Sequence, residues 1–195
     1  MKSVHWRSTA ACCYAIGLAI GAVGTGCLDD GNSREGEESV SSAIVLDTSS
    51  SYAFFGVQSG KCVQPVNGST ASNVRVEIST CTGAAIQRYR PQATSAGFFL
   101  LRNELTGFCL DVSLQSPLDG AAIIEFPCNG GANQQWSFTD VASGAERVTA
   151  RHSGKVLDVT AQVTTDGTLL EQWTSNNGAN QQFTLVEKVP ALLPD

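Results

Sequence analysis

Few residues of this 195-residue chain combine the type and the spacing that catalysis requires. Beyond residue 50, Asp111 and Asp158 stand 47 positions apart, and His152 is the one histidine. A glycosidase needs two carboxylates that flank a single bond, whereas these two aspartates fall in separate copies of an internal repeat. A serine nucleophile needs a neighbouring base, and no G-x-S-x-G motif accompanies His152. The sequence therefore predicts no enzymatic activity.

Four cysteines beyond the N-terminal region could form covalent links. An even number of cysteines in an exported chain indicates disulfides, which persist in oxidising compartments. The sequence has no C-x-x-C pair, and a single histidine beyond residue 50 does not complete a zinc site. No phosphate-binding glycine loop or calcium loop occurs either, so we expect neither a metal nor a cofactor. The four residues are Cys62, Cys81, Cys109 and Cys128.

The charge of the chain is negative and unevenly distributed. The formal net charge is −6, and residues 28–50 carry six acidic residues against one basic residue. Nucleic-acid binding relies on clustered Lys and Arg that displace counterions from phosphates. We therefore expect no nucleic-acid partner.

Residues 1–26 have the composition of an export signal. A positively charged start precedes an apolar run over 10–23, and small residues then lead into Cys27. The run is too short and too rich in Gly and Ala to predict a spanning helix. Two interpretations stay open: a plain cleaved signal, or a bacterial lipoprotein-like signal after which Cys27 is lipidated. Lipidation predicts a membrane-anchored protein that faces the periplasm or the cell surface, and plain cleavage predicts a secreted one.

Residues 27–50 are rich in Ser, Asp, Glu and Gly. This composition is typical of a solvated, disordered tether. A brief apolar patch at 43–46 is compatible with a short strand at its end.

From residue 51 the chain repeats itself with an offset of 47 residues. The string at 129–135 returns at 176–182 with one substitution, and two pairs of cysteines share a spacing of nineteen positions. Three copies are present, at about 52–94, 95–141 and 142–187. Each copy ends in a Gln-x-aromatic motif: Gln87-Arg88-Tyr89, Gln134-Gln135-Trp136 and Gln181-Gln182-Phe183.

The residues that position these motifs are expected to be strands. Short apolar or alternating segments are separated by Gly, Asp, Asn and Pro, and no 3.6-residue period is sustained within the repeats. Four strands in each of three copies predict an all-β fold of about twelve strands, closed so that few edges stay unpaired. In the second copy these segments are 98–101, 109–112, 122–126 and 136–138.

Three repeats of this length, each ending in Gln-x-aromatic, resemble the ricin B-type lectins, which are β-trefoil carbohydrate-binding modules. The segment 107–112, followed by 126–136, is very similar to those modules. The resemblance covers about residues 52–187. It implies a β-trefoil domain over 51–188, followed by a short tail at 189–195.

The resemblance also implies structural roles. Tyr89, Trp136 and Phe183 are expected in the core around a pseudo-threefold axis, and their motif glutamines are expected to bond the nearby turn. The implied disulfides are Cys62–Cys81 and Cys109–Cys128. The third copy has Val156 and Ser175 at these places and lacks the link.

Carbohydrate binding is the function that the resemblance implies. A pyranose offers an apolar face to an aromatic ring, and its hydroxyls suit carboxylates and amides. The matching residues of the third repeat are Asp158, Glu171, Trp173, Asn180 and Gln181.

The second repeat is expected to bind more weakly, because its ring is smaller and Ile124 replaces a polar residue. The first repeat is expected to have lost binding. The residues of the second repeat are Asp111, Phe126, Asn133 and Gln134, and those of the first are Gln64, Ser79 and Ile86.

Two classes of function stay open. One is an exported lectin for galactose- or xylan-type glycans, acting alone or beside a hydrolase supplied in trans. The other is a protein-interaction trefoil, an inhibitor or adaptor subunit with degenerate sugar sites. The aspartates and asparagines also fit plain turn chemistry, but that explanation does not require a surface-directed Trp173.

Overall fold

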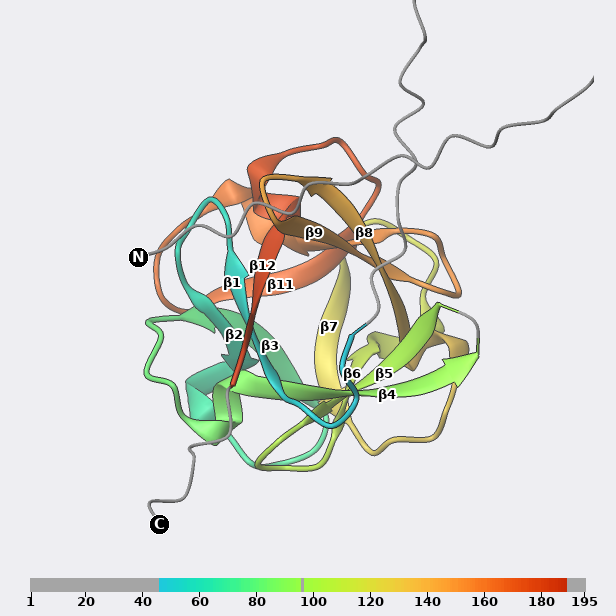
Figure 1. The fold of residues 1–195 in the computed structure, drawn as a ribbon. Helices are drawn as coiled ribbons and strands as arrows, with labels where there is room; N and C mark the ends of the chain where they lie inside the picture. Colours follow the sequence, from blue (N-terminus) through green and yellow to red (C-terminus); the bar gives the residue numbers. More distant parts are fainter. Residues whose placement is uncertain (1–45, 96, 189–195) are drawn as a thin grey trace, which may run out of the picture. The chain divides into compact units, whose positions relative to one another are not determined.

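The structure, a computed structural model, describes residues 46–95 and 97–188, and this part of the chain forms twelve strands (Figure 1). The strands are β1 (Tyr52–Gly56), β2 (Cys62–Pro65), β3 (Val74–Ser79), β4 (Arg88–Ser95), β5 (Phe98–Asn103), β6 (Cys109–Val112), β7 (Ala121–Phe126), β8 (Gln135–Ala142), β9 (Ala145–Ala150), β10 (Val156–Val159), β11 (Thr168–Trp173) and β12 (Phe183–Glu187).

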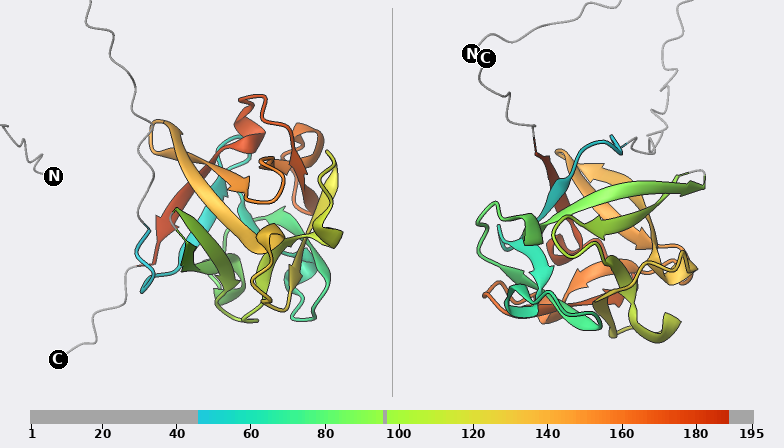
Figure 2. Two further views of the ribbon diagram at one scale, coloured as in Figure 1. Left: turned by 90° about the vertical axis from the view of Figure 1, so that its right-hand side faces the viewer. Right: turned by 90° about the horizontal axis from the view of Figure 1, so that it is seen from below.

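Six of the strands close into a barrel. Antiparallel pairing runs from β1 to β4, β5, β8, β9 and β12, and from β12 back to β1. The hairpins β4–β5 and β8–β9 each join two consecutive copies of the repeat (Figure 2). Closure leaves no free edge in this ring of strands.

The other six strands form three hairpins, one in each copy: β2–β3, β6–β7 and β10–β11. The hairpins also pair with one another through β3–β7, β7–β11 and β11–β3. A six-stranded barrel with a triangle of hairpins is a β-trefoil, which confirms the predicted all-β fold of three four-stranded repeats.

Short turns accompany the strands. The described residues also contain six three-residue 3₁₀ turns, which a search for helical periodicity does not detect because a single turn has no period. They are η1 (Val66–Gly68), η2 (Ala85–Gln87), η3 (Ser113–Gln115), η4 (Ala132–Gln134), η5 (Thr160–Gln162) and η6 (Ala179–Gln181).

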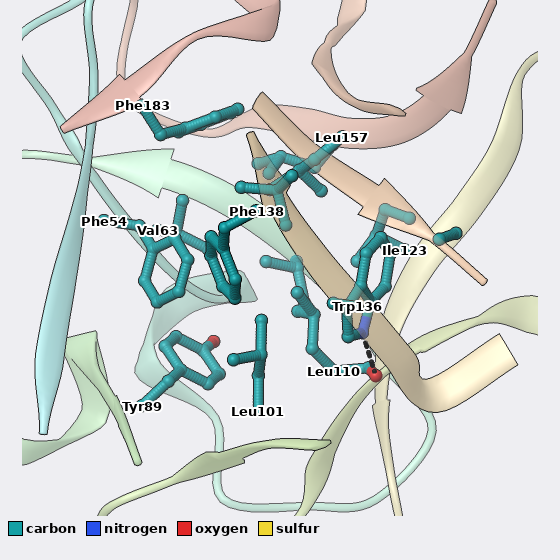
Figure 3. Close-up of a cluster of buried hydrophobic side chains, with 14 of the residues drawn as sticks. Phe54, Val63, Tyr89, Leu101, Leu110, Ile123, Trp136, Phe138, Leu157 and Phe183 are labelled. Carbon is teal, nitrogen blue, oxygen red and sulfur yellow. Dashed lines mark hydrogen bonds between the residues drawn. The ribbon is translucent and has the colours of Figure 1, made fainter. Parts of the chain in front are cut away.

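The aromatic residues of the Gln-x-aromatic motifs are all buried in one core (Figure 3). Trp136 donates its indole N–H to the Leu110 carbonyl at 3.0 Å. The ring of Tyr89 packs edge-on against Phe54, with centroids 5.8 Å apart, and Phe54 also contacts Phe138. The motif aromatics thus share the core with further phenylalanines that the sequence interpretation did not single out.

Both implied disulfides are present. Cys62–Cys81 and Cys109–Cys128 each link Cα atoms 5.1 Å apart and close a loop within one repeat. A loop of this length stabilises a protein by about 3 kcal/mol on the chain-entropy account. In the third repeat, buried Val156 replaces the first cysteine of the pair.

The folded domain begins earlier than the predicted boundary at residue 51. Leu46 is 7% exposed and belongs to the core cluster, and the Asp47 N–H donates to the Tyr52 hydroxyl at 3.0 Å. The end of the predicted tether is therefore part of the domain. The signal at 1–26, Cys27, the remainder of the tether and the tail at 189–195 lie outside the described residues. Within the described ranges, no helix is long and apolar enough to cross a membrane.

Glu125 is a fully buried carboxylic acid at the junction of repeats. Tyr89 donates its hydroxyl to Glu125 Oε1 at 3.0 Å, and Thr106 donates to Oε2 at 2.8 Å. These bonds favour the charged form, but burial dominates and raises the pKa of Glu125 to about 7. The other two copies have Ile78 and Gln172 at this place, so the fold does not need an acid here.

We expect Glu125 to make stability fall as pH rises from about 4.5 to 7. In this window the native state keeps a proton that the unfolded chain has released, so unfolding becomes easier as pH increases. A pKa of about 7 against 4.5 corresponds to about 3 kcal/mol in total. Glu125→Gln removes this dependence, which urea unfolding at pH 5 and pH 8 measures.

The native chain, unfolded in urea at the same two pH values, is the reference. A Glu125→Gln variant whose stability varies with pH as in the native chain contradicts the assignment.

Candidate functional site

A cavity of about 340 Å³ opens on the third repeat. It contains four of the five residues predicted for a sugar site: Asp158, Glu171, Trp173 and Asn180. Its remaining lining residues are Thr160, Ala161, Gln162 and Asn176.

The β10–β11 hairpin places the acidic and aromatic side chains on one face. Asp158 lies opposite Glu171, and Val156 lies opposite Trp173. Because alternate residues of a strand share a face, Glu171 and Trp173 both face the cavity. Trp173 is 40% exposed, so its indole is available at the surface.

Gln181 does not line the cavity. It is fully buried, and its Nε2 donates to Asp158 Oδ2 at 2.8 Å, while its Oε1 accepts from the Asn176 N–H at 2.9 Å. Asn180 Nδ2 donates to the same Asp158 oxygen at 2.9 Å. Gln181 and Asn180 therefore orient the carboxylate, and Asp158 Oδ1 takes part in none of these bonds.

Two acidic groups share this cavity. Burial raises the pKa of Asp158, against hydrogen bonds from Gln181 and Asn180 that lower it. Burial also raises the pKa of Glu171, and the negative charge of Asp158 adds to the effect. The oxygens of the two carboxyl groups form an acceptor-rich wall beside the indole.

The second repeat carries a smaller cavity of about 240 Å³. Gln134 Nε2 donates to Asp111 Oδ2 at 2.8 Å, which is equivalent to the hydrogen bond between Gln181 and Asp158 in the third copy. Gln134, like Gln181, is fully buried. Phe126 is 37% exposed, and Ile124 occupies the place of Glu171. This cavity has one carboxylate and a smaller ring. Its lining residues are Asn73, Asp111, Ser113, Leu114, Gln115, Ile124, Phe126, Asn129 and Asn133.

In the first repeat the equivalent polar groups bond to one another. Gln64 Nε2 donates to Glu77 Oε1 at 3.0 Å, and Gln87 Nε2 donates to Gln64 Oε1 at 2.9 Å. Gln64 and Glu77 are both nearly buried. These hydrogen bonds are made within the protein, between side chains of the first repeat.

The sequence did not predict the 3₁₀ turns that line the two cavities, η3 in the second repeat and η5 in the third. Both turns have left-handed backbone. In η3, Leu114 and Gln115 have φ of 57° and 53°, and in η5, Ala161 and Gln162 have φ of 53° and 59°. Such angles cost about 1–2 kcal/mol for an ordinary L-residue. Strained backbone of this kind gathers at functional sites. Neither Leu, Ala nor Gln signals a left-handed turn in a sequence.

The neighbouring repeat also contributes to each site. Asn73 of the first repeat lines the second cavity. Gly120 of the second repeat lies beside the third, where an added Cβ would be 3.7 Å from Trp173 and from Glu171 Oε2. Asp119 fixes this junction by accepting from the Thr174 N–H at 2.7 Å and pairing with Lys155. A search confined to single repeats could not find these residues.

Comparison with known proteins assigns the scaffold. A family model described as ricin-type beta-trefoil lectin domain matches residues 50–183. The designed threefold-symmetric protein ThreeFoil is 36% identical with a TM-score of 0.69, and the alignment covers 72% of this chain and 99% of that one. No curated protein matches the chain.

Natural proteins share the same fold. The exo-β-1,3-galactanase 1,3Gal43A from Clostridium thermocellum is 33% identical with a TM-score of 0.69 over 73% of this chain, which corresponds to 31% of the galactanase. The C-terminal half of an earthworm R-type lectin, solved in complex with GalNAc, has a TM-score of 0.56 over 71% of this chain and 99% of its own. At 17% identity, this second likeness concerns the fold alone.

Relief of the backbone strain in η3 is expected to stabilise the domain. The first repeat has Asn67-Gly68 at the corresponding left-handed positions, and both residue types tolerate them. We expect Leu114→Asn with Gln115→Gly to raise the free energy of unfolding by about 1–2 kcal/mol. Thermal melting then shifts upward by about 3–6 °C.

The reverse exchange in the first repeat, Asn67→Leu with Gly68→Gln, provides the control and should destabilise by a similar amount. An unchanged or lower melting temperature for the η3 variant would show that this turn stores no strain.

Proposed function

The chain belongs to the ricin-type β-trefoil lectin domain family, and from this premise we propose that it binds carbohydrate chiefly through the cavity of its third repeat. The observation that carries the proposal is the half-exposed indole of Trp173 beside two carboxylates in one cavity. Plain turn chemistry accounts for the aspartates and asparagines of the repeats. It does not account for a large ring turned outward next to them.

The cavity suits the two faces of a sugar. The indole of Trp173 offers a flat apolar surface for the C–H face of a pyranose. Asp158 Oδ1 and the Glu171 carboxylate are placed to accept hydroxyl hydrogens, and charge-assisted bonds of this type are stronger than neutral ones. Because Gln181 and Asn180 already hold Asp158 in place, little ordering is left for the ligand to impose.

Binding without catalysis fits the position of the acids. Asp158 and Glu171 are directly opposite each other on paired strands, so both belong to the same wall of the cavity. A glycosidase needs carboxylates on two sides of the scissile bond. We propose a binding module that a hydrolase supplied in trans would complement.

Galactose- or xylan-type glycans are the ligand class that we propose. The 33% identity to a segment of an exo-β-1,3-galactanase supports this choice, as do the ligands common among ricin B-type modules. The second cavity, with Asp111 and Phe126, is the weaker site. Two weak sites on one molecule raise the overall affinity for a polymeric glycan through effective concentration.

We also propose that the chain is exported and anchored to a membrane through lipidated Cys27. The two disulfides support export, because such bonds persist in oxidising compartments. A protein without the lipid would be secreted.

Truncation of the indole is expected to abolish most of the binding. We expect Trp173→Ala to weaken the affinity for galactose or xylan oligosaccharides about tenfold or more, because stacking and its buried area are lost. Isothermal titration of the full chain and retention on galactose and xylan columns measure the change. Phe126→Ala is the matched control and should have a much smaller effect. If Trp173→Ala does not change retention on the columns, the proposed site is wrong and the protein-interaction alternative is favoured.

The affinity for sugar is expected to fall as the medium is acidified. Asp158 accepts hydroxyl hydrogens best when ionised, and its pKa and that of Glu171 lie above their ordinary values of 3.8 and 4.5. Release should therefore begin at a higher pH than for exposed carboxylates. Titrations between pH 4 and 8 should show a weaker dependence for Asp158→Asn and none for Asp158→Asn with Glu171→Gln.

Asp111→Asn serves as the control and should keep the pH dependence of the third site. An affinity that is constant or increases on acidification contradicts the role of these carboxylates.

A further inference from the structure

Two arginines face each other on the wall of the barrel, on strands that line neither sugar cavity. Arg90 of β4 and Arg102 of β5 are directly paired across the hairpin, and both are exposed. Like charges directly opposite on neighbouring strands destabilise a sheet. A pair of this kind needs an explanation.

The fold itself does not require the arginines. At the two equivalent places of the pseudo-threefold barrel, the paired residues are Ser137 with Thr149 and Thr184 with Phe55. Four neutral residues therefore fill positions of the same geometry. The positive charge belongs to this hairpin alone.

The nearby acid does not neutralise the pair. Glu104 is paired with Arg88 and lies 3.4 Å from Lys188 Nζ, which leaves its charge already compensated. Arg102 Nε donates to the Gly107 carbonyl at 2.8 Å, so that guanidinium is held in place by a neutral group. Among residues 46–95 and 97–188, neither Arg90 nor Arg102 forms an ion pair with a carboxylate.

Both arginines line two hollows of the surface. One of about 400 Å³ also contains Thr48 and Gln92, whose side chains offer neutral hydrogen-bonding groups. The other, of about 200 Å³, extends toward Asn103, Gly107 and the carboxylate of Glu104, whose charge Arg88 and Lys188 compensate. Because the same two side chains border both hollows, a ligand longer than a single ion could follow them along the hairpin.

We propose that Arg90 and Arg102 form a second glycan-binding site, which takes the sulfate or carboxylate groups of an acidic polysaccharide. A guanidinium presents a planar fork of donors that matches these oxyanions in bidentate fashion. Two opposed forks bind one anionic group or two successive ones and relieve the repulsion between them. Thr48 and Gln92 lie where sugar hydroxyls would follow. This site goes beyond the proposed lectin cavities and does not depend on them.

The test replaces Arg90 and Arg102 with the residues found at the equivalent places of the β8–β9 hairpin, Ser137 and Thr149. The full chain with Arg90→Ser and Arg102→Thr is titrated against dextran sulfate, polygalacturonate and uncharged dextran. We expect the native chain to bind at least one of the two polyanions, more weakly as salt is raised, and not dextran. The double variant should lose about tenfold or more in affinity, because two charge-assisted bonds are removed. Binding of dextran sulfate alone assigns the site to sulfate, and binding of polygalacturonate alone assigns it to carboxylate.

A control variant removes two positive charges elsewhere, through Arg147→Thr on β9 and Lys61→Gln next to β2. This control variant should retain the affinity for the polyanions, and so should Trp173→Ala. The Arg90/Arg102 variant should retain the binding of galactose or xylan oligosaccharides. Equal losses in both charge-removing variants would reduce the effect to net charge and overturn the proposal. Binding to anionic vesicles with no binding to either polysaccharide would overturn it as well.

Discussion

One buried amide in each repeat connects the fold to the site. The glutamine of every Gln-x-aromatic motif accepts a backbone N–H of the preceding turn and donates to a side chain on the second strand of its repeat. In the third copy these partners are the Asn176 N–H and Asp158 Oδ2. Removing such a group would leave buried partners unsatisfied at a cost of about 1–3 kcal/mol. The bonds that close the turn therefore also orient the carboxylate, so that the site is held by the scaffold. The three glutamines are Gln87, Gln134 and Gln181.

The same amides explain how acidic groups can be kept nearly buried. Asp111 and Asp158 are 3% and 4% exposed, and burial raises the pKa of each. Donors from the motif glutamines offset part of this penalty by favouring the charged form. A carboxylate held this way is shielded from water and keeps a fixed direction. Both properties strengthen a hydrogen bond to a ligand hydroxyl.

The sequence was sufficient for features that recur with the repeat. The twelve strands, the disulfides of two copies and the grouping of Asp158 with Trp173 all follow from the 47-residue offset and the family resemblance. Three kinds of feature were not predicted: contacts between copies, local backbone geometry and the exact start of the domain. Gly120 of the second repeat lies beside Trp173 and Glu171 of the third. The left-handed turn at Ala161 depends on backbone geometry that alanine does not signal. Leu46 packs into the core although its flanking composition resembles a tether.

The first repeat separates what the fold needs from what a ligand needs. Its motif glutamine keeps its place but bonds to Gln64, an uncharged residue, and its turn has relaxed to Asn67-Gly68. This copy folds with the same strands and the same register of its hairpin. Neither an acid bonded to the motif glutamine nor a strained turn is therefore required to build a trefoil lobe. The second and third copies nevertheless retain both features next to an outward-facing ring. Since each feature costs stability and the scaffold is complete without it, the proposed recognition of a ligand would account for both features together.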